Sequence, residues 1–152
     1  MELVNVTIRS EQPGDYHAIA AVNAIAFSYG YGMGEVSLVS ALRNRMTFDP
    51  ELSIIAEHNG NIIGHALFTP QKVLVKGETL DAVILGPIAV RPKFQKLGIG
   101  SMLIEEGHKR STHKGYHFSL LLGHSTYYPR FGYKTKMFGS SHIQIHVTIY
   151  PN

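Results

Sequence analysis

The chain has 152 residues, with 14 Lys and Arg against 11 Asp and Glu, nine His and no Cys. This length predicts a single domain over residues 1–152, and the lack of cysteine excludes disulfides, thiolate metal sites and a cysteine nucleophile. The formal charge of +3 is too small to indicate binding to nucleic acid.

The first third of the sequence predicts a strand followed by two helices. The expected strand covers 4–9, where apolar and polar side chains alternate, and the expected helices cover 15–27 and 35–46, where apolar residues recur at helical spacing. Asp15 is a suitable cap for the first helix, and Asp49-Pro50 ends the second. Between the helices, residues 28–34 contain three glycines, and we interpret this stretch as a surface loop near a ligand.

The remaining sequence predicts six more strands and a third helix. In chain order, the expected elements are strands at 52–58, 62–68 and 80–90, a helix at 98–114, a strand at 118–122, a short helical turn from Ser125, and a closing pair of strands at 133–136 and 142–150. Asn59-Gly60-Asn61 is a strong hairpin signal, so the first three of these strands should be antiparallel. The apolar run 118–122 follows a strand and a helix, so it should pair in parallel with 80–90 and be buried on both faces. The pattern therefore predicts an α/β fold with a mixed, mostly antiparallel sheet flanked by helices.

A glycine-rich turn between the strand ending at Val90 and the third helix is the clearest chemical signal. The segment Gln95-Lys96-Leu97-Gly98-Ile99-Gly100 lies where free backbone N–H groups and the helix dipole favour an anion. Its two glycines would let the main chain approach a pyrophosphate, while Lys96 and Gln95 add charge and donors. The spacing of a phosphate-binding P-loop is absent, and Leu103 replaces the third small residue of a dinucleotide fingerprint. Glycines also mark ordinary strand-to-helix turns, so the turn alone leaves that alternative open.

Three segments together carry a more specific signal. They are Leu85-Gly86-Pro87-Ile88-Ala89-Val90-Arg91-Pro92, the run from Gln95 to Leu103, and Tyr127-Tyr128-Pro129-Arg130-Phe131-Gly132-Tyr133. In these segments, and in the order of its elements over nearly the whole chain, the sequence resembles the GNAT superfamily of N-acetyltransferases, particularly the YhbS-like predicted acetyltransferases. The resemblance implies the GNAT fold with a splayed parallel pair of strands. It also implies transfer of an acetyl group from acetyl-CoA to a primary amine of a small molecule or peptide, by direct attack in a ternary complex.

The resemblance implies a role for each part of the cofactor-binding region. Gln95, Gly98 and Gly100 occupy the defined positions of the family's pyrophosphate motif. By the same resemblance, the backbones of Ile88, Ala89 and Val90 would pair with the pantetheine arm, and the N–H groups of Leu97, Gly98, Ile99 and Gly100 would hold the pyrophosphate, with Lys96 adding charge and Ser101 a hydroxyl. Gly86-Pro87 would place a bulge that splays the sheet and admits the arm.

The catalytic groups are expected on either side of the thioester. The resemblance implies that Tyr128 is the acid that protonates the leaving thiolate, with Tyr127 as its local competitor, and a backbone N–H near Ile88 would stabilise the oxyanion. Many relatives carry a Glu on the strand that enters the motif, but residues 83–88 contain no carboxylate. Glu35 is the candidate base, against the alternative that it is a helix N-terminal carboxylate favoured by the dipole. A water chain to Glu35 or to His65 is a further alternative.

Several other expectations are negative or compete with this interpretation. The pairs His142 and His146, and His113 and His117, lack a carboxylate at ligand spacing, so we expect no metal. No apolar run has membrane-spanning length and no signal peptide is apparent, so we expect a cytoplasmic protein with no membrane contact. The alternative function is a non-catalytic acyl-CoA-binding module that regulates a partner. Exposed sheet edges also make a homodimer plausible.

Overall fold

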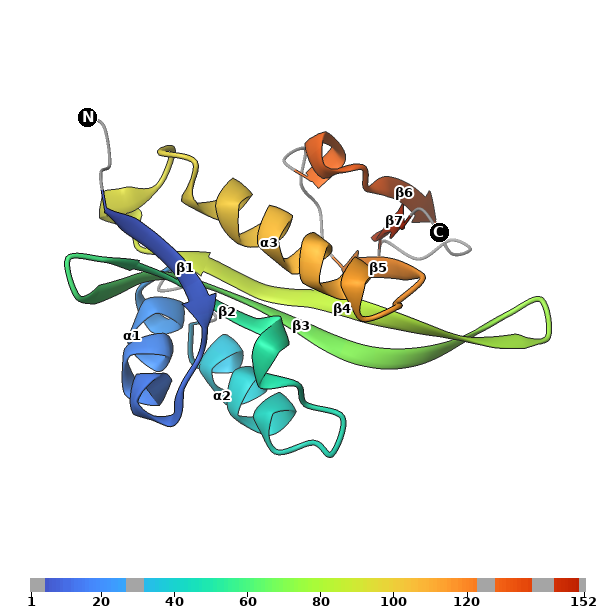
Figure 1. Cartoon of the computed structure of the whole chain (residues 1–152), viewed down its shortest axis with the longest axis horizontal. Helices are drawn as coiled ribbons and strands as arrows, with labels where there is room; N and C mark the ends of the chain where they lie inside the picture. Colours follow the sequence, from blue (N-terminus) through green and yellow to red (C-terminus); the bar gives the residue numbers. More distant parts are fainter. Residues whose placement is uncertain (1–4, 27–31, 123–127, 138–143, 151–152) are drawn as a thin grey trace.

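The computed structural model describes residues 5–26, 32–122, 128–137 and 144–150. Within these ranges seven strands form one sheet in the order β1-β2-β3-β4-β5-β7-β6. The strands are β1 (Val6–Ser10), β2 (Ser53–His58), β3 (Asn61–Val75), β4 (Glu78–Val90), β5 (Phe118–Leu122), β6 (Lys134–Met137) and β7 (Gln144–Ile149). The helices are α1 (Tyr16–Ala26), α2 (Gly32–Arg43) and α3 (Ile99–His113), joined by the short 3-10 helices η1 (Pro13–Asp15), η2 (Pro50–Leu52), η3 (Pro92–Phe94) and η4 (Tyr128–Phe131). Helices α1 and α2 cover one face of the sheet and α3 the other (Figure 1).

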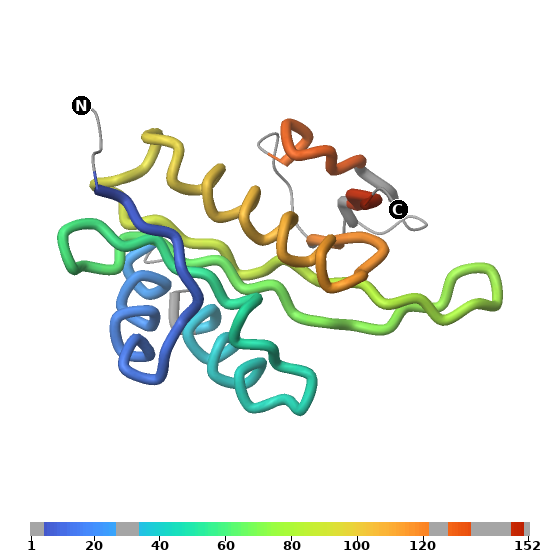
Figure 2. The backbone as a smooth tube through the Cα atoms, in the orientation of Figure 1, coloured from blue at the N-terminus to red at the C-terminus, as the bar shows by residue number. Residues whose placement is uncertain are grey.

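The predicted hairpin at Asn59-Gly60 and the hairpin that joins β3 to β4 form because their turn residues adopt left-handed backbone conformations. Asn59 and Gly60 have φ of 50° and 79°, and Lys76 and Gly77 have φ of 50° and 82°, as the turns between tightly paired antiparallel strands require. Strand β3 does not end at Phe68 as predicted but continues to Val75. Residues 72–81, from the pair Lys72↔Asp81 to the turn, form a two-stranded ribbon at one end of the molecule (Figure 2), which we call the β3–β4 arm.

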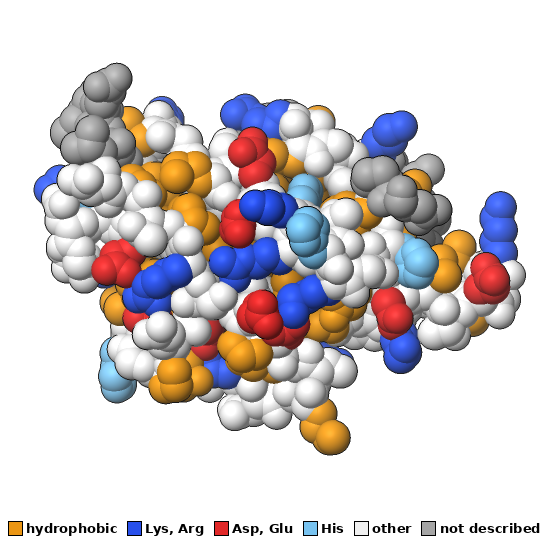
Figure 3. Space-filling model, viewed as in Figure 1, with side chains coloured by type: hydrophobic (Ala, Val, Ile, Leu, Met, Phe, Trp, Pro, Cys, Tyr) orange, Lys and Arg blue, Asp and Glu red, His pale blue; other side chains and the backbone are white. Residues whose placement is uncertain are grey.

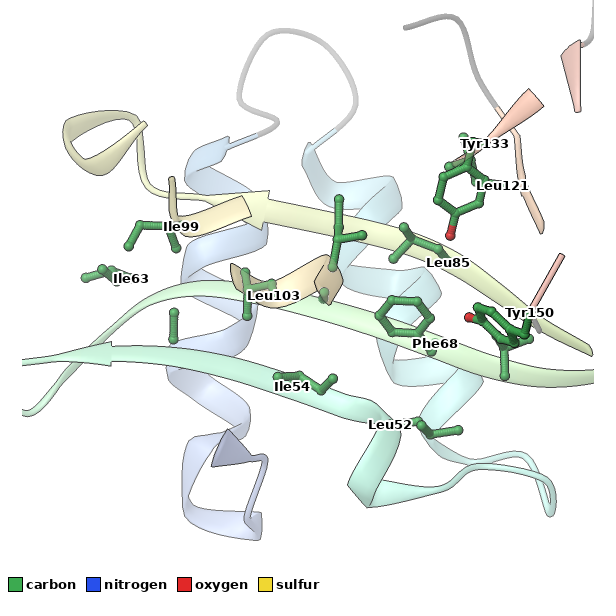
Figure 4. Close-up of a cluster of buried hydrophobic side chains, with 14 residues drawn as sticks. Leu52, Ile54, Ile63, Phe68, Leu85, Ile99, Leu103, Leu121, Tyr133 and Tyr150 are labelled. Atoms are coloured by element: carbon green, nitrogen blue, oxygen red, sulfur yellow. The ribbon is translucent and has the colours of Figure 1, made fainter. Parts of the chain in front are cut away.

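Apolar side chains form a core on each face of the sheet. The α3 face carries the larger cluster: Leu52, Ile54, Ala56, Ile63, Ala66, Phe68, Val83, Leu85, Ile99, Leu103, Ile104, Leu121, Tyr133 and Tyr150 (Figure 4). The α1–α2 face carries a smaller one: Ile19, Val22, Val39, Ile55, Ile62, Leu67 and Ala89. Helix α3 lies close to the sheet at Gly107, where an added Cβ would stand 1.9 Å from the Phe68 ring. The sheet is therefore buried on both faces over its central strands, by two differently built layers.

The sheet splays where β4 and β5 part. Their parallel pairing runs from Ala82↔Phe118 to Ile84↔Leu120, after which β5 continues with β7 and β4 continues with β3. The register on β3 changes between the pairs Phe68↔Leu85 and Ala66↔Ile88, so Gly86 and Pro87 together face one residue of β3 and form a bulge. The structure thus confirms the parallel pair, the bulge and the closing antiparallel pair β6–β7.

Element boundaries differ from the predicted ones at a few points. Helix α2 covers Gly32–Arg43 instead of 35–46. It begins earlier because Gly32 and Gly34 form part of its first turn. It ends earlier because the backbone after Arg43 forms i→i+3 hydrogen bonds, such as the one from the Arg45 N–H to the Leu42 carbonyl at 3.1 Å. Phe118 and Leu120 of β5 are half-buried, so this strand is not buried on both faces as predicted. Residues 28–31 of the predicted loop and the predicted helix start at Ser125 lie outside the described residues.

On the face shown in Figure 3, the described residues form no large patch of one charge. Acidic, basic and apolar side chains are interspersed there, and ion pairs such as Arg9 with Asp15 at 2.8 Å join neighbouring elements. Of the helices in the described ranges, none is both long and apolar enough to span a bilayer.

Candidate active site

The turn that opens α3 is built around two left-handed residues. Lys96 has φ of 64°, and Gly98, the N-cap of α3, has φ of 87°. The first helical hydrogen bond runs from the Met102 N–H to the Gly98 carbonyl at 3.1 Å. The N–H groups of residues 98–100 therefore precede the helical ladder and lie at the positive end of the helix dipole. This geometry suits a bound anion, as the glycine spacing predicts.

A cavity of about 620 Å³, which we call the α3 cavity, lies in front of this turn. Its walls combine the end of β4, the turn and η4: Ile88, Val90, Phe94, Gln95, Lys96, Gly98, Ile99, Gly100, Ser101, Tyr128 and Arg130. Nine of the predicted site residues are thus brought together. Three are not: the side chain of Ala89 belongs to the core on the α1–α2 face, Leu97 is half-buried outside the cavity wall, and Glu35 lines a second cavity described below.

Side chains before the turn fix its path back to the sheet. The Gln95 Nε2 group donates to the Val90 carbonyl at 3.0 Å. The Arg91 side chain donates to the Ile62 carbonyl at 3.0 Å, and the Arg91 N–H donates to the Ile63 carbonyl at 2.8 Å. Gln95 lies in the expected position. Its side-chain amide donates to β4, however, and so holds the turn to the end of this strand.

Tyr128 occupies the wall between two cavities. It begins η4 and contacts Tyr133 in a T-shaped arrangement with ring centroids 6.1 Å apart. The Tyr133 hydroxyl is in turn hydrogen-bonded to Ser119 at 2.6 Å and to His108 Nε2 at 2.8 Å. Burial raises the pKa of Tyr133 and lowers the pKa of His108 to about 4, so both groups are neutral near pH 7. Tyr128 is therefore packed against an uncharged aromatic cluster, while its competitor Tyr127 lies outside the described residues.

The second cavity, of about 460 Å³, lies between α2 and the splayed part of the sheet, and we call it the α2 groove. It is lined by Glu35, Leu38, Leu42, Arg45, Thr69, Ile84, Leu85, Gly86, Pro87, Ile88, Leu121 and Tyr128. Ile88 and Tyr128 also line the α3 cavity. Within the described part of the chain, Glu35 Oε2 and Thr69 Oγ1 are buried without a hydrogen-bond partner. Of these groove residues, the sequence analysis singled out Glu35, Ile88, Tyr128 and the Gly86-Pro87 bulge, and missed Thr69 and Arg45.

His65 lies in a buried polar chain beneath α1 and α2 instead of in either cavity. Its Nδ1 accepts from Asn23 Nδ2 at 3.2 Å, and its Nε2 is 3.0 Å from Ser53 Oγ. Ser53 Oγ donates to Glu11, which also accepts from Arg43 at 2.9 Å. Burial, with the charge of Arg43, lowers the pKa of His65 to about 3. The neutral ring is therefore a structural group that joins α1, β2 and β3.

The histidine pairs give no metal site in the described ranges. No group of three His, Asp or Glu side chains there is close enough to hold a metal ion. His113 is the last residue of α3 and is exposed, while His142 and the side chain of His146 lie outside the described residues.

Comparison with known proteins points to one family. A family model described as Acetyltransferase (GNAT) domain matches residues 7–135. Among curated proteins, the chain is 34% identical over 136 residues to the uncharacterized N-acetyltransferase YjhQ of Escherichia coli K12, covering 88% of this chain and 72% of that protein. It is 32% identical over 127 residues to the uncharacterized N-acetyltransferase YhbS of the same strain, covering 84% and 72%.

Solved structures give the same result. A GNAT family acetyltransferase from Brucella melitensis, crystallised with acetyl-CoA, matches with a TM-score of 0.77 and 35% identity, covering 93% of this chain and 86% of that one. The YhbS protein of Escherichia coli, crystallised with CoA, matches with a TM-score of 0.82 and 27% identity, covering 98% and 83%. These matches confirm the resemblance read from the three sequence segments.

Proposed function

The chain belongs to the GNAT family and is an acetyl-CoA-dependent acetyltransferase; from that premise we propose that it acetylates a primary amine by direct attack in a ternary complex. One observation carries the proposal: the α3 cavity and the α2 groove share Ile88 and Tyr128 as walls. A thioester held in the first cavity and an amine held in the second would meet at these two residues.

The α3 cavity has the features that acetyl-CoA requires. The N–H groups at residues 98–100 offer donors to a diphosphate at the positive end of α3, and Lys96 adds a positive charge beside them. Beyond Ile84, β4 has left β5, so its edge from Ile88 to Val90 can pair with the amides of the pantetheine arm as a neighbouring strand would. The cofactor would then run from the turn toward the bulge at Gly86-Pro87.

The proposed chemistry needs one base, one acid and one oxyanion donor. The amine nitrogen forms a bond to the thioester carbonyl carbon, and a backbone N–H near Ile88 stabilises the oxygen that becomes negative. The C–S bond then breaks, and the Tyr128 hydroxyl gives its proton to the leaving thiolate. Glu35 lines the same groove and receives, directly or through water, the proton that the amine loses. Its buried Oε2 has no partner among the described residues, which supports this role.

Thiol release from acetyl-CoA tests the proposal. Purified protein is given acetyl-CoA with pools of alkylamines, peptides and aminoglycosides, and free CoA is measured with a thiol reagent, while calorimetry measures CoA binding separately. We expect heat on CoA addition and thiol release with at least one pool. Tight CoA binding without release from any pool would favour the non-catalytic acyl-CoA-binding module, and no binding at all would contradict both functions.

We also propose which unit performs this reaction, a single domain that can form a homodimer. We take residues 1–152 to act as one domain, since both cavities draw on elements from α2 to η4. The outer strands β1 and β6 leave sheet edges to which a second copy could pair. Light scattering at the concentration of the activity assay distinguishes a dimer from a monomer.

A further inference from the structure

Three residues of α2 and one residue just beyond its end form a wall of the α2 groove. Glu35, Leu38, Leu42 and Arg45 follow one another at intervals of three and four residues and all line the groove. From Glu35 to Leu42, a rise of about 1.5 Å per residue gives about 10 Å along α2, and Arg45 follows in the turn after Arg43, where its N–H donates to the Leu42 carbonyl at 3.1 Å. Opposite charges thus mark the two ends of the wall, with leucines between them.

The direction of α2 puts the acidic end next to the proposed reaction. Arg43, at the C-terminal end of α2, donates to Glu11 at 2.9 Å, and the Glu11 N–H donates to the carbonyl of Ser53 at the start of β2 at 2.9 Å. The helix crosses beneath the sheet from β2 toward β4 (Figure 4), so its N-terminus lies toward the splayed strands. Glu35 is therefore on the side of Ile88 and Tyr128, and Arg45 is at the far end.

Arg45 is the charged residue at this far end of the groove. It also lines a neighbouring cavity that contains Lys72 and Lys114. Those two lysines are paired, Lys72 with Asp81 at 2.8 Å and Lys114 with Asp49 at 2.9 Å. Arg45 makes no ion pair with any residue in the described part of the chain, so it can meet a negative group of a ligand.

Between Glu35 and Arg45, the described lining of the groove is mostly apolar and includes the polar side chain of Thr69. Leu38, Leu42, Ile84 and Leu121 supply apolar walls, and 46% of Leu38 is exposed to solvent. Thr69, which is only 4% exposed, has its hydroxyl buried without a partner in the described ranges. Burying a polar atom without a hydrogen bond is costly, so a ligand that covers the groove should bring a cation to Glu35, and a peptide could also bring an amide to Thr69.

We propose, on the basis of the function proposed above, that the acceptor is an elongated zwitterion. Its primary amine lies at Glu35, an apolar body covers Leu38 and Leu42, and a carboxylate or another anion reaches Arg45. An ω-amino acid of eight or so carbons and a short apolar peptide with a free carboxylate share this chemistry. A polyamine does not, since its second cation would face Arg45 in a groove of low polarity.

Amines of matched length test the proposal. The kcat/KM for thiol release is measured with 8-aminooctanoate, octylamine and 1,8-diaminooctane, and with an apolar tripeptide and its C-terminal amide. We expect the carboxylate to improve kcat/KM about fivefold over the neutral amine, as a partly exposed ion pair gives about 1 kcal/mol, and the diamine to be the poorest substrate. The tripeptide should exceed its amide by a similar factor, because these two compounds differ only in the terminal carboxylate.

Charge reversal at the far end provides the matched control. Arg45→Glu should abolish the preference for 8-aminooctanoate and make 1,8-diaminooctane the better substrate, whereas Lys109→Glu, an exposed charge change on α3, should leave the order unchanged. Calorimetry of the same amines with the CoA-loaded protein is a second measurement. Arg45-dependent binding without thiol release would overturn the proposed function and keep this inference. Equal binding and turnover of the three amines, or a preference unaffected by Arg45→Glu, would overturn the inference alone.

Discussion

The two faces of the sheet are built on different principles. On the α3 face, apolar side chains such as Phe68 pack directly against a glycine of the helix, and the cavity in front of α3 presents main-chain N–H groups. On the α1–α2 face, a buried chain of polar groups from Arg43 to Asn23 passes through neutral His65, and the groove presents side chains from several elements.

The two faces would bind different substrates of the transferase, acyl-CoA on the α3 face and the acceptor on the α1–α2 face. A diphosphate is the same for every acyl-CoA, and backbone amides can bind it whatever side chains surround them. An acceptor differs from one enzyme to another, and side chains of α2, β3 and β4 must recognise it. We therefore expect damage on the α3 face to affect folding or cofactor affinity, and changes on the α2 face to affect acceptor choice or sensitivity to pH.

The largest effect should come from the contact of α3 with β3. In Gly107→Ala the new Cβ would lie 1.9 Å from the Phe68 ring, so the helix or the ring must move. We expect a loss of about 3 kcal/mol in the free energy of unfolding, which lowers Tm by about 10 °C. Gly14→Ala is the matched control, because an added Cβ there meets nothing within 4 Å. Equal melting temperatures for the two variants would contradict the close packing of this face.

The polar chain on the other face should make stability fall in acid. The pKa of His65 drops from its ordinary 6.5 to about 3 in the folded protein, so the unfolded chain binds a proton between these values that the folded chain does not. Neutral His65 therefore makes its full contribution to the free energy of unfolding above pH 6.5. This contribution is lost as the pH falls toward 3, by up to about 1.4 kcal/mol per pH unit.

Urea unfolding at several pH values checks this dependence. In His65→Gln the slope of stability between pH 6.5 and 5 should become shallower, leaving the part due to His108, whose pKa also falls, to about 4. His17→Gln, a change of an exposed histidine, should retain the full slope. If His65→Gln behaves as His17→Gln does, the buried ring is not the group that titrates.

The shared wall of the two cavities should be sensitive to loss of a single hydroxyl. Tyr128→Phe removes the proposed proton donor and is expected to lower kcat about ten- to hundredfold, the smaller end applying because a thiolate leaves readily. CoA affinity measured by calorimetry should change little. Tyr116→Phe, in a cavity at the other end of the groove, is the control with wild-type turnover. An unaltered kcat in Tyr128→Phe would remove this residue from the mechanism.

The smallest effect should come from a change at the turn that opens α3, where backbone N–H groups would bind the diphosphate. Gly98 and Gly115 flank α3 with the same φ of 87°, and an added Cβ meets nothing within 4 Å at either position. Alanine at either glycine should therefore cost about 1–2 kcal/mol of stability through backbone strain. Only Gly98→Ala should also weaken CoA binding, by about tenfold. A similar loss of affinity in Gly115→Ala would show that the turn has no special part in binding.

Sequence reasoning was most successful where the signal was local. The hairpin at Asn59-Gly60 and the turn at Gly98 depend on residues adjacent in the chain, so the glycine positions predict their geometry. The extension of β3 was missed because Pro70 and the polar residues after it break the strand pattern. Strand β2 has ended its pairing at Leu67, so Pro70 faces no ladder on that side and is accepted.

The groove was out of reach for a different reason. Glu35 and Arg45 share a helical spacing that the sequence displays, but the spacing does not say what that face covers. The position of α2 depends on the contact of Arg43 with Glu11, between residues 32 apart in the chain, and Thr69 enters the groove only through the pairing of β3 with β4 at Ile84. Such a site exists only after the tertiary fold has formed.

The β3–β4 arm offers a practical handle on the molecule. Its tip is the turn Lys76-Gly77, an added Cβ at Gly77 meets nothing within 4 Å, and Leu74 beside it is 74% exposed. Exposed hairpin tips tolerate inserted peptides well. A tag spliced between Lys76 and Gly77 would immobilise the enzyme by the end of the arm and leave the mouths of the α3 cavity and the α2 groove open to solvent.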